Sequence, residues 1–295
     1  MISRFGSRFS FRAFSTPSIG SSENITVVQE NEHVAHIKLN RPAKYNTFTL
    51  DMWKDLKSEV ERLGDEPKCR AIVLSGEGKV FCAGIDLVGG MGEIIKVMQN
   101  EKIETGRKAR LLRKFIGEVQ DCFTVFEKCP KPVIAAIHSH CIGAGIDLIT
   151  ACDIRYASQC ANFSIKEVDV GLAADVGTLN RIQKVVGNDS WTREVSMTAR
   201  DFGADEALKF GLINRIYPTR KELIDGAVSI AKTIAEKSPI AVQGTKVTLN
   251  YSRDHTTDDS LNFIKTWNMS QLLSTDLVNS ATAVMNKEKA TYEDV

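Results

Sequence analysis

The sequence predicts an α/β fold, in which strands and helices alternate along the chain. Two short apolar runs, residues 71–75 and 133–137, have the composition of buried strands. Residues 50–63 and 103–128 are longer, and their apolar side chains recur at helical spacing. Because helices separate these strands, we expect the strands to pair in parallel, with the helices as crossover connections.

The remaining elements follow in chain order. Residues 25–29 and 33–39 are expected to form a hairpin whose second strand ends before Pro42. A loop is expected before the helix at 103–128, and the Gly143 turn should open a further helix. The C-terminal part of the chain is expected to be mostly helical, with helices at 205–210, 221–238, 240–252 and 258–286.

The composition is typical of a globular protein and excludes several classes of function. The chain has 295 residues, 43% of them hydrophobic, and its 38 basic residues balance 37 acidic ones, so no global field attracts nucleic acid. No run approaches the roughly 18 apolar residues of a membrane span, so membrane insertion is not expected. Seven cysteines and five histidines lack metal-ligand spacing, which indicates reduced, buried thiols and no metal site.

The first residues have the composition of a mitochondrial transit peptide. Arg4, Arg8 and Arg12 lie among serines and phenylalanines, and no acidic residue precedes Glu23. Cleavage after Phe14 would make residues 1–14 the transit peptide, and the mature protein would lie in the mitochondrial matrix. A peroxisomal location is the alternative, but the C-terminus lacks a Ser-Lys-Leu-type signal.

Three acidic residues stand out as candidate chemical groups. Asp147, Glu167 and Asp175 lie among apolar and small residues, where burial raises the pKa of a carboxyl and lets it exchange protons near neutral pH. Most acidic residues are instead surface or ion-paired groups, which is our interpretation of Asp153, with Arg155 as its expected partner. We interpret Asp169 in the same way, although in an extended strand it would face the same way as Glu167.

A glycine turn precedes the first of these acids. Gly143-Ala144-Gly145 follows a buried strand and begins a helix, where unpaired backbone N–H groups suit an anion or a developing oxyanion. A turn that serves only close packing would have the same sequence. The pattern is not a dinucleotide fingerprint, because Leu148 stands where its third glycine would be.

Four motifs in order resemble the enoyl-CoA hydratase/isomerase (crotonase) superfamily. They are residues 81–87 (FCAGIDL), 129–137 (CPKPVIAAI), 143–147 (GAGID) and 166–177 (KEVDVGLAADVG). Within the superfamily they are most similar to the Δ3,5-Δ2,4-dienoyl-CoA isomerases. The similarity extends from about residue 25 to near residue 289.

The resemblance implies a fold, an assembly and a ligand. Residues 15–204 would form the crotonase core, a spiral of β-β-α turns, and residues 205–295 a helical region that builds trimers, commonly paired into hexamers. The ligand would be an acyl-CoA, and no cofactor is expected because CoA is part of the substrate.

The resemblance also implies how the thioester is held. The backbone N–H groups of Ala83 and Ala144 would polarise its carbonyl, and Ala144 departs from the glycine of many relatives. Lys44 would contact the CoA phosphates. The alternative is that Lys44 is a solvated loop lysine without a ligand. Further residues lining the substrate would be Ala83, Gly84, Ile85, Asp86, Leu87 and Gly145.

The three acids would define the reaction. In the dienoyl isomerases that this triplet resembles, two double bonds shift together as one proton leaves carbon 2 and another arrives at carbon 6. We assign Glu167 to carbon 2 and Asp175 to carbon 6, with Asp147 as a third catalytic residue that orients or tunes the pair; a direct role of Asp147 is the alternative. One alternative is a 2-enoyl-CoA hydratase that holds water with Asp147 and Glu167. The other is an acyl-CoA- or RNA-binding protein with vestigial activity.

Overall fold

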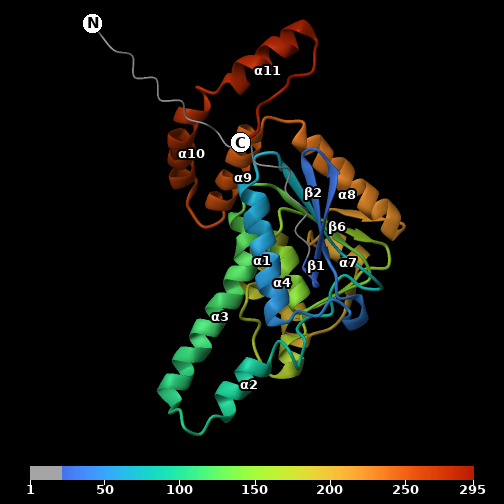
Figure 1. The fold of residues 1–295 in the computed structure, drawn as a ribbon, viewed down its shortest axis with the longest axis vertical. Coiled ribbons are helices and arrows are strands. Elements are labelled where there is room, and N and C mark those ends of the chain that lie inside the picture. The colour runs from blue at the N-terminus through green and yellow to red at the C-terminus, as the bar shows by residue number, and fades with distance from the viewer. Residues whose placement is uncertain (1–21) are drawn as a thin grey trace, which may run out of the picture.

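A six-stranded sheet forms the centre of the computed structural model, which describes residues 22–295 (Figure 1). The strand order is β1-β2-β3-β4-β6-β9, and every pair is parallel except the antiparallel β1–β2 hairpin. The bounds are Ile25–Asn31, Val34–Leu39, Ala71–Gly76, Val133–Ile137, Ile154–Ser158 and Arg215–Tyr217. The predicted α/β class, the hairpin and the parallel pairing are confirmed.

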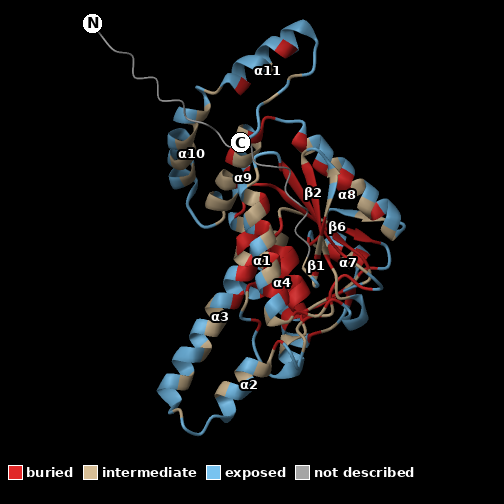
Figure 2. Ribbon diagram, in the orientation of Figure 1, coloured by how far each residue is buried: buried red, intermediate tan, exposed pale blue. Residues whose placement is uncertain are grey.

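Helices cover both faces of this sheet because strand side chains alternate between the faces. Ile72 and Leu74 point toward a core that includes side chains of α1, α3 and α4. Val73 and Ile134 point the other way, toward α8. The bounds of these helices are Leu50–Asp65, Thr105–Lys128, Ala144–Ala151 and Arg220–Ala235. Buried residues accordingly concentrate at the sheet and the inner helices (Figure 2).

A second, three-stranded sheet lies beside the first and carries the turns of the candidate site. It has the order β5-β7-β8, with bounds His140–Ile142, Asn162–Ser164 and Phe202–Gly203. Short helices connect this region: η1 at Pro42–Lys44, η2 at Glu167–Val170, α5 at Thr178–Val186, α6 at Asp189–Thr198 and α7 at Ala204–Lys209.

Two expectations about the helices are wrong. The loop expected before α3 contains a helix, α2 at Gly92–Gln99, and α2 with the outer half of α3 projects from the body (Figure 1). The helix expected at 258–286 is two helices, α10 at Thr257–Gln271 and α11 at Thr275–Asn286. The break occurs because the Ser274 side chain caps α11 by accepting a hydrogen bond from the Asp276 N–H.

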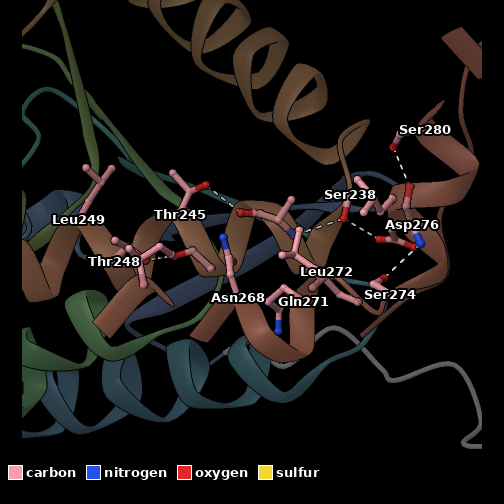
Figure 3. Close-up of a pocket in the computed structure, with 15 residues that line it drawn as sticks. Ser238, Thr245, Thr248, Leu249, Asn268, Gln271, Leu272, Ser274, Asp276 and Ser280 are labelled. Atoms are coloured by element: carbon pink, nitrogen blue, oxygen red, sulfur yellow. Dashed lines mark hydrogen bonds between the residues drawn. The ribbon is translucent and has the colours of Figure 1, made fainter. Parts of the chain in front are cut away.

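The C-terminal helices enclose a hollow. A groove of about 450 Å³ lies between α9 (Pro239–Ser252), α10 and α11. Figure 3 shows Ser238, Ser274 and Ser280 around Asp276 at one end of this groove. None of the three predicted acids lines it, so this hollow is separate from the candidate chemistry.

A partly buried ion pair connects α9 to the main sheet. Lys246 donates to Asp153 at 2.7 Å, and Asp153 also accepts a hydrogen bond from the Val133 N–H. The expectation that Arg155 pairs with Asp153 is wrong, because Arg155 donates to the carbonyl of Leu212 and to nearby helix carbonyls instead.

Two other sequence expectations concern burial and the membrane. Six of the seven cysteines are buried as expected, but Cys160 is exposed. Within residues 22–295, no helix has the length and apolarity needed to cross a bilayer. The predicted transit peptide, residues 1–14, lies outside the described residues.

Candidate active site

Three separate segments carry the predicted acids. Asp147 lies in the first turn of α4, Glu167 begins η2, and Asp175 lies in the loop before α5. Desolvation by the surrounding protein raises the pKa of all three carboxyls above the usual values. The apolar and small sequence neighbours predicted this direction.

Asp147 is buried and held from one side. Its Oδ1 accepts hydrogen bonds from the Thr178 N–H at 2.6 Å and from the Thr178 hydroxyl at 2.7 Å. Its Oδ2 is buried and has no partner among the described residues. Burial raises the pKa of Asp147 to about 6, although the bonds from Thr178 oppose this effect.

Glu167 has a higher pKa than Asp147. Burial, followed by the negative charge of Asp147, raises the pKa of Glu167 to about 7. Its Oε2 is buried without a partner in the described chain. Its Oε1 lies against the glycine turn, 3.3 Å from where a Cβ on Gly143 would be.

Asp175 is the most accessible of the three. Its side chain is exposed in the single chain, yet desolvation by the surrounding protein still raises the pKa of its carboxyl. The Gln120 side chain on α3 donates to the Asp175 backbone carbonyl at 2.6 Å, which fixes the loop rather than the carboxyl. Asp169, by contrast, is exposed and lies 3.5 Å from the Lys166 ammonium, as expected of a surface residue.

Two backbone turns meet beside Glu167. Gly84 and Gly143 both have positive φ, +96° and +52°, a conformation that favours glycine. A Cβ on Gly143 would be 3.9 Å from the Gly84 Cα, so the two turns are in close contact. Ala144 follows as the first residue of α4 and has no positive φ, so its Cβ is tolerated there.

One of the two predicted backbone donors is already occupied. The Ala83 N–H donates to the Tyr45 carbonyl at 3.0 Å, so the prediction that this group is available for a ligand is wrong in this structure. The Ile85 N–H, two residues on, has no acceptor in the described part of the chain. The Ala144 N–H likewise has none there, because the first N–H groups of a helix lack intrahelical partners.

The other predicted ligand-lining residues differ in their roles. Asp86 pairs with Arg41 at 3.2 Å and accepts hydrogen bonds from the Val88 and Gly89 N–H groups, so its carboxyl shapes the loop. Gly145 is buried against Cys141, whereas Leu87 is exposed. Lys44 is exposed in η1 and has no carboxylate within 4 Å among residues 22–295.

A hollow of about 310 Å³ begins at Glu167. Apolar side chains form most of its wall, and the Ser196 hydroxyl in that wall is buried without a partner among the described residues. The hollow lies between η2, α5 and α6. Its lining residues are Ile165, Glu167, Val168, Ala173, Ala174, Leu179, Gln183, Thr192, Arg193, Ser196 and Met197.

Sequence reasoning missed Thr178 and the Ile85 donor. Thr178 directly follows Gly177 at the start of a helix, where a hydroxyl commonly binds an oxygen acceptor or caps the helix. No sequence signal separates Ile85 from Ala83, because the difference depends on the Tyr45 carbonyl.

Backbone N–H groups without an acceptor beside buried carboxyls suit the polarisation of a carbonyl and the exchange of protons. The chain belongs to the enoyl-CoA hydratase/isomerase family, whose model matches residues 29–295.

Named relatives and solved structures agree with that membership. The mitochondrial Δ(3,5)-Δ(2,4)-dienoyl-CoA isomerase of Rattus norvegicus is 49% identical over 266 residues, covering 90% of this chain and 80% of the relative. The peroxisomal enzyme of that name from Arabidopsis thaliana is 40% identical, covering 92% of this chain and 98% of its own. The crystal structure of an enoyl-CoA hydratase from Bacillus anthracis superposes with a TM-score of 0.81 at 27% identity, covering 92% of this chain and 99% of its own.

Proposed function

We propose that this protein isomerises 3,5-dienoyl-CoA to 2,4-dienoyl-CoA in the oxidation of unsaturated fatty acids. The observation that carries the proposal is the contact of the Glu167 carboxyl with the glycine turn that precedes the unoccupied Ala144 N–H. The raised pKa values of Asp147, Glu167 and Asp175 support it. The names of the relatives that are 40–49% identical support the same reaction.

The backbone donors act on the thioester. In the proposed complex the Ile85 and Ala144 N–H groups donate to the thioester oxygen, which stabilises the enolate as a proton leaves carbon 2. A preorganised donor of this kind contributes about 3–4 kcal/mol to the transition state. This step therefore depends on the positions of the two turns. It does not depend on the side chains of residues 85 and 144, because the donors are backbone groups.

The carboxyls move the protons. Glu167, in its ionised form, takes a proton from carbon 2, and the negative charge spreads along the conjugated chain. Asp175, in its protonated form, delivers a proton to carbon 6, so the double bonds move from positions 3 and 5 to positions 2 and 4. Asp147 stays beside Glu167 as a fixed charge. Because only protons move, the proposed reaction needs no redox cofactor, and CoA belongs to the substrate.

The hollow beside Glu167 fits the hydrocarbon end of the substrate. Its wall is largely apolar, and it begins at the carboxyl that would act at carbon 2. Ser196 and Met197, on α6, would lie along the chain beyond the reacting carbons. At the other end, the unpaired Lys44 ammonium in the described chain would meet the CoA phosphates.

The cellular setting is also part of the proposal. We place the protein in the mitochondrial matrix, supported by the arginine-rich start of the sequence and by the mitochondrial names of several relatives. A trimer or hexamer is the proposed assembly, with residues 205–295 as the helical assembly region of a core at 15–204. The nearly balanced charge gives no support to a role in binding RNA.

A direct assay tests the activity. Mature protein is mixed with a 3,5-dienoyl-CoA, and ultraviolet absorbance follows conjugation of the diene with the thioester; hydration of crotonyl-CoA is measured in parallel. We expect fast conjugation and little hydration. Hydration without conjugation would contradict the proposal and would make the protein a 2-enoyl-CoA hydratase.

A further inference from the structure

Thr178 holds one oxygen of Asp147 and leaves the other unbound. Both donors of Thr178, the backbone N–H and the hydroxyl, point to Oδ1, at 2.6 and 2.7 Å. Thr178 is fully buried and Asp147 is only 1% exposed, so water does not compete for these bonds. Oδ2 has no donor among the described residues. The geometry is therefore that of a carboxylate anchored through a single oxygen.

This anchoring favours the charged form of Asp147. Hydrogen bonds donated to a carboxylate stabilise its ionised form. The two donors also lie at the N-terminus of the nine-residue helix α5, where the helix dipole favours a negative charge. Both effects oppose the desolvation that raises the pKa of Asp147.

Few other charges face Asp147. Glu167 acts on it from η2 and Asp175 from the loop before α5, and two thiols that interact with Asp147, Cys82 and Cys141, have raised pKa values and are neutral. Arg181 on α5 is the one nearby cation among the groups that act on Asp147. Arg181 is already paired with Glu127, at 2.8 Å, on α3. Thr178 is therefore the direct partner that keeps Asp147 ionised.

The negative charge of Asp147 acts on the Glu167 carboxyl. The Glu167 carboxyl lies against Gly143, one helical turn before Asp147, and the Asp147 charge is the second-largest cause of the raised pKa of Glu167. A base with a pKa near the working pH transfers protons most effectively.

We propose that Thr178 is a positioning residue for catalysis: it keeps Asp147 ionised and in place, and the fixed charge of Asp147 makes Glu167 a stronger base. This inference rests on the proposed function, in which Glu167 takes the proton from carbon 2. Thr178 itself is fully buried.

The test compares Thr178→Val, which lacks the hydroxyl, with Thr178→Ser, which keeps it. Loss of a hydrogen bond to a charged group shifts the pKa of Asp147 upward by about one pH unit. In Thr178→Val we expect the acid limb of kcat/KM to move to lower pH, and kcat to fall about three- to tenfold with little change in KM. Thr178→Ser should keep the wild-type pH profile. A wild-type profile in Thr178→Val would overturn the inference.

A double-mutant cycle separates this role from a structural one. In an Asp147→Asn background the charge is absent, so Thr178→Val should shift the pH profile no further. The same shift in that background would contradict the inference. If Thr178→Val does not fold, Thr178→Ala is used in the same cycle, with Thr178→Ser again as the control.

A titration of the carboxyls without substrate tests the role of Thr178 separately from the isomerase activity. The infrared carbonyl band of protonated carboxyls is followed against pH in wild type, Thr178→Val and Glu167→Gln, and the last variant assigns the Glu167 signal. A lower pKa of Glu167 in Thr178→Val supports the inference even if dienoyl-CoA is not isomerised. An unchanged pKa overturns it even if the isomerase activity is present.

Discussion

Asp175 is the carboxyl that separates the proposed isomerisation from hydration. Asp175→Asn removes the acid that would deliver the proton to carbon 6, so we expect isomerase activity to fall by a factor on the order of 10² to 10⁴. The measurement is kcat with a 3,5-dienoyl-CoA. Asp169→Asn is the matched control, because Asp169 is exposed in the same segment, and it should retain activity. Full activity in Asp175→Asn would exclude the assigned role.

Gly143 is the backbone position on which the proposed geometry most depends. In Gly143→Ala a Cβ would lie 3.3 Å from Glu167 Oε1, in a backbone with φ of +52°. We expect kcat to fall at least tenfold while the fold is kept, because the carboxyl and the turn must both shift. Gly117→Ala on α3 is the control, since its Cβ would meet no atom within 4 Å. Equal activity of the two variants would show that the turn tolerates a side chain.

Glu167 should make folding stability depend on pH. Its pKa is raised to about 7 in the folded protein, so the folded state binds this proton more tightly than the unfolded chain does. The resulting stabilisation is complete below the unfolded pKa and disappears as pH rises through about 7. Glu167→Gln should therefore be more stable than wild type at pH 8, by roughly 1–3 kcal/mol, and not at pH 4. Urea unfolding at both pH values checks the sign; a gain at pH 4 alone would contradict it.

At the residue scale, the sequence predicts the kind of chemistry better than the atoms that perform it. Small and apolar neighbours are enough to predict raised pKa values for Asp147 and Glu167, because burial is a property of the local pattern. Which backbone N–H is free to bind a ligand does not follow from the local pattern. The Ala83 N–H is not free, because it donates to the Tyr45 carbonyl. Such a contact depends on tertiary structure, so motif spacing cannot distinguish Ala83 from Ile85.

At the scale of elements, the buried ammonium group of Lys246 connects α9 to the main sheet. Lys246 is 5% exposed and donates to Asp153 and to the Phe126 and Lys131 carbonyls. Lys246→Met leaves the Asp153 carboxylate, which is 20% exposed, with the Val133 N–H as its remaining partner, so we expect a loss of about 1–3 kcal/mol in unfolding free energy. Urea unfolding of Lys246→Met measures this loss.

The double variant Lys246→Met/Asp153→Asn is the control, since it removes both charges. It should recover part of the stability, because an uncompensated charge is the main cost. If both variants were as stable as wild type, this pair would contribute nothing to the attachment of α9.

A strong hydrophobic periodicity predicts that a helix or strand is present, whereas the residue at which a helix ends depends on single contacts. The buried strands β3 and β4 and the amphipathic helices α1 and α3 follow directly from their patterns. The pattern at 258–286 continues through Leu272 and Leu273, so it does not show the break between α10 and α11. That break depends on the cap at Ser274, and the pairing of β9 with β6 depends on the whole sheet.

For the whole molecule, the C-terminal helices carry exposed apolar side chains that the proposed trimer or hexamer would have to cover. α10 and α11 extend from the body in Figure 1, away from α2. Leu273 is 86% exposed and Met285 is 83% exposed in the single chain. Exposed apolar side chains of this density indicate a surface that is covered in the assembled protein. The proposed trimer or hexamer would bury them.

A charge placed on this surface tests the assembly. Leu273→Asp puts a carboxylate where the proposed interface is apolar, and burying it unpaired would cost several kcal/mol. We expect sedimentation velocity to show a shift from trimer or hexamer toward monomer. Asn279→Asp on α11 adds the same charge at an exposed position that is already polar, and it should leave the assembly intact. An unchanged oligomer in Leu273→Asp would show that other surfaces hold the subunits together, and a monomeric wild type would contradict the proposed assembly. Loss of isomerase activity together with the oligomer would further indicate that a neighbouring subunit completes the substrate site.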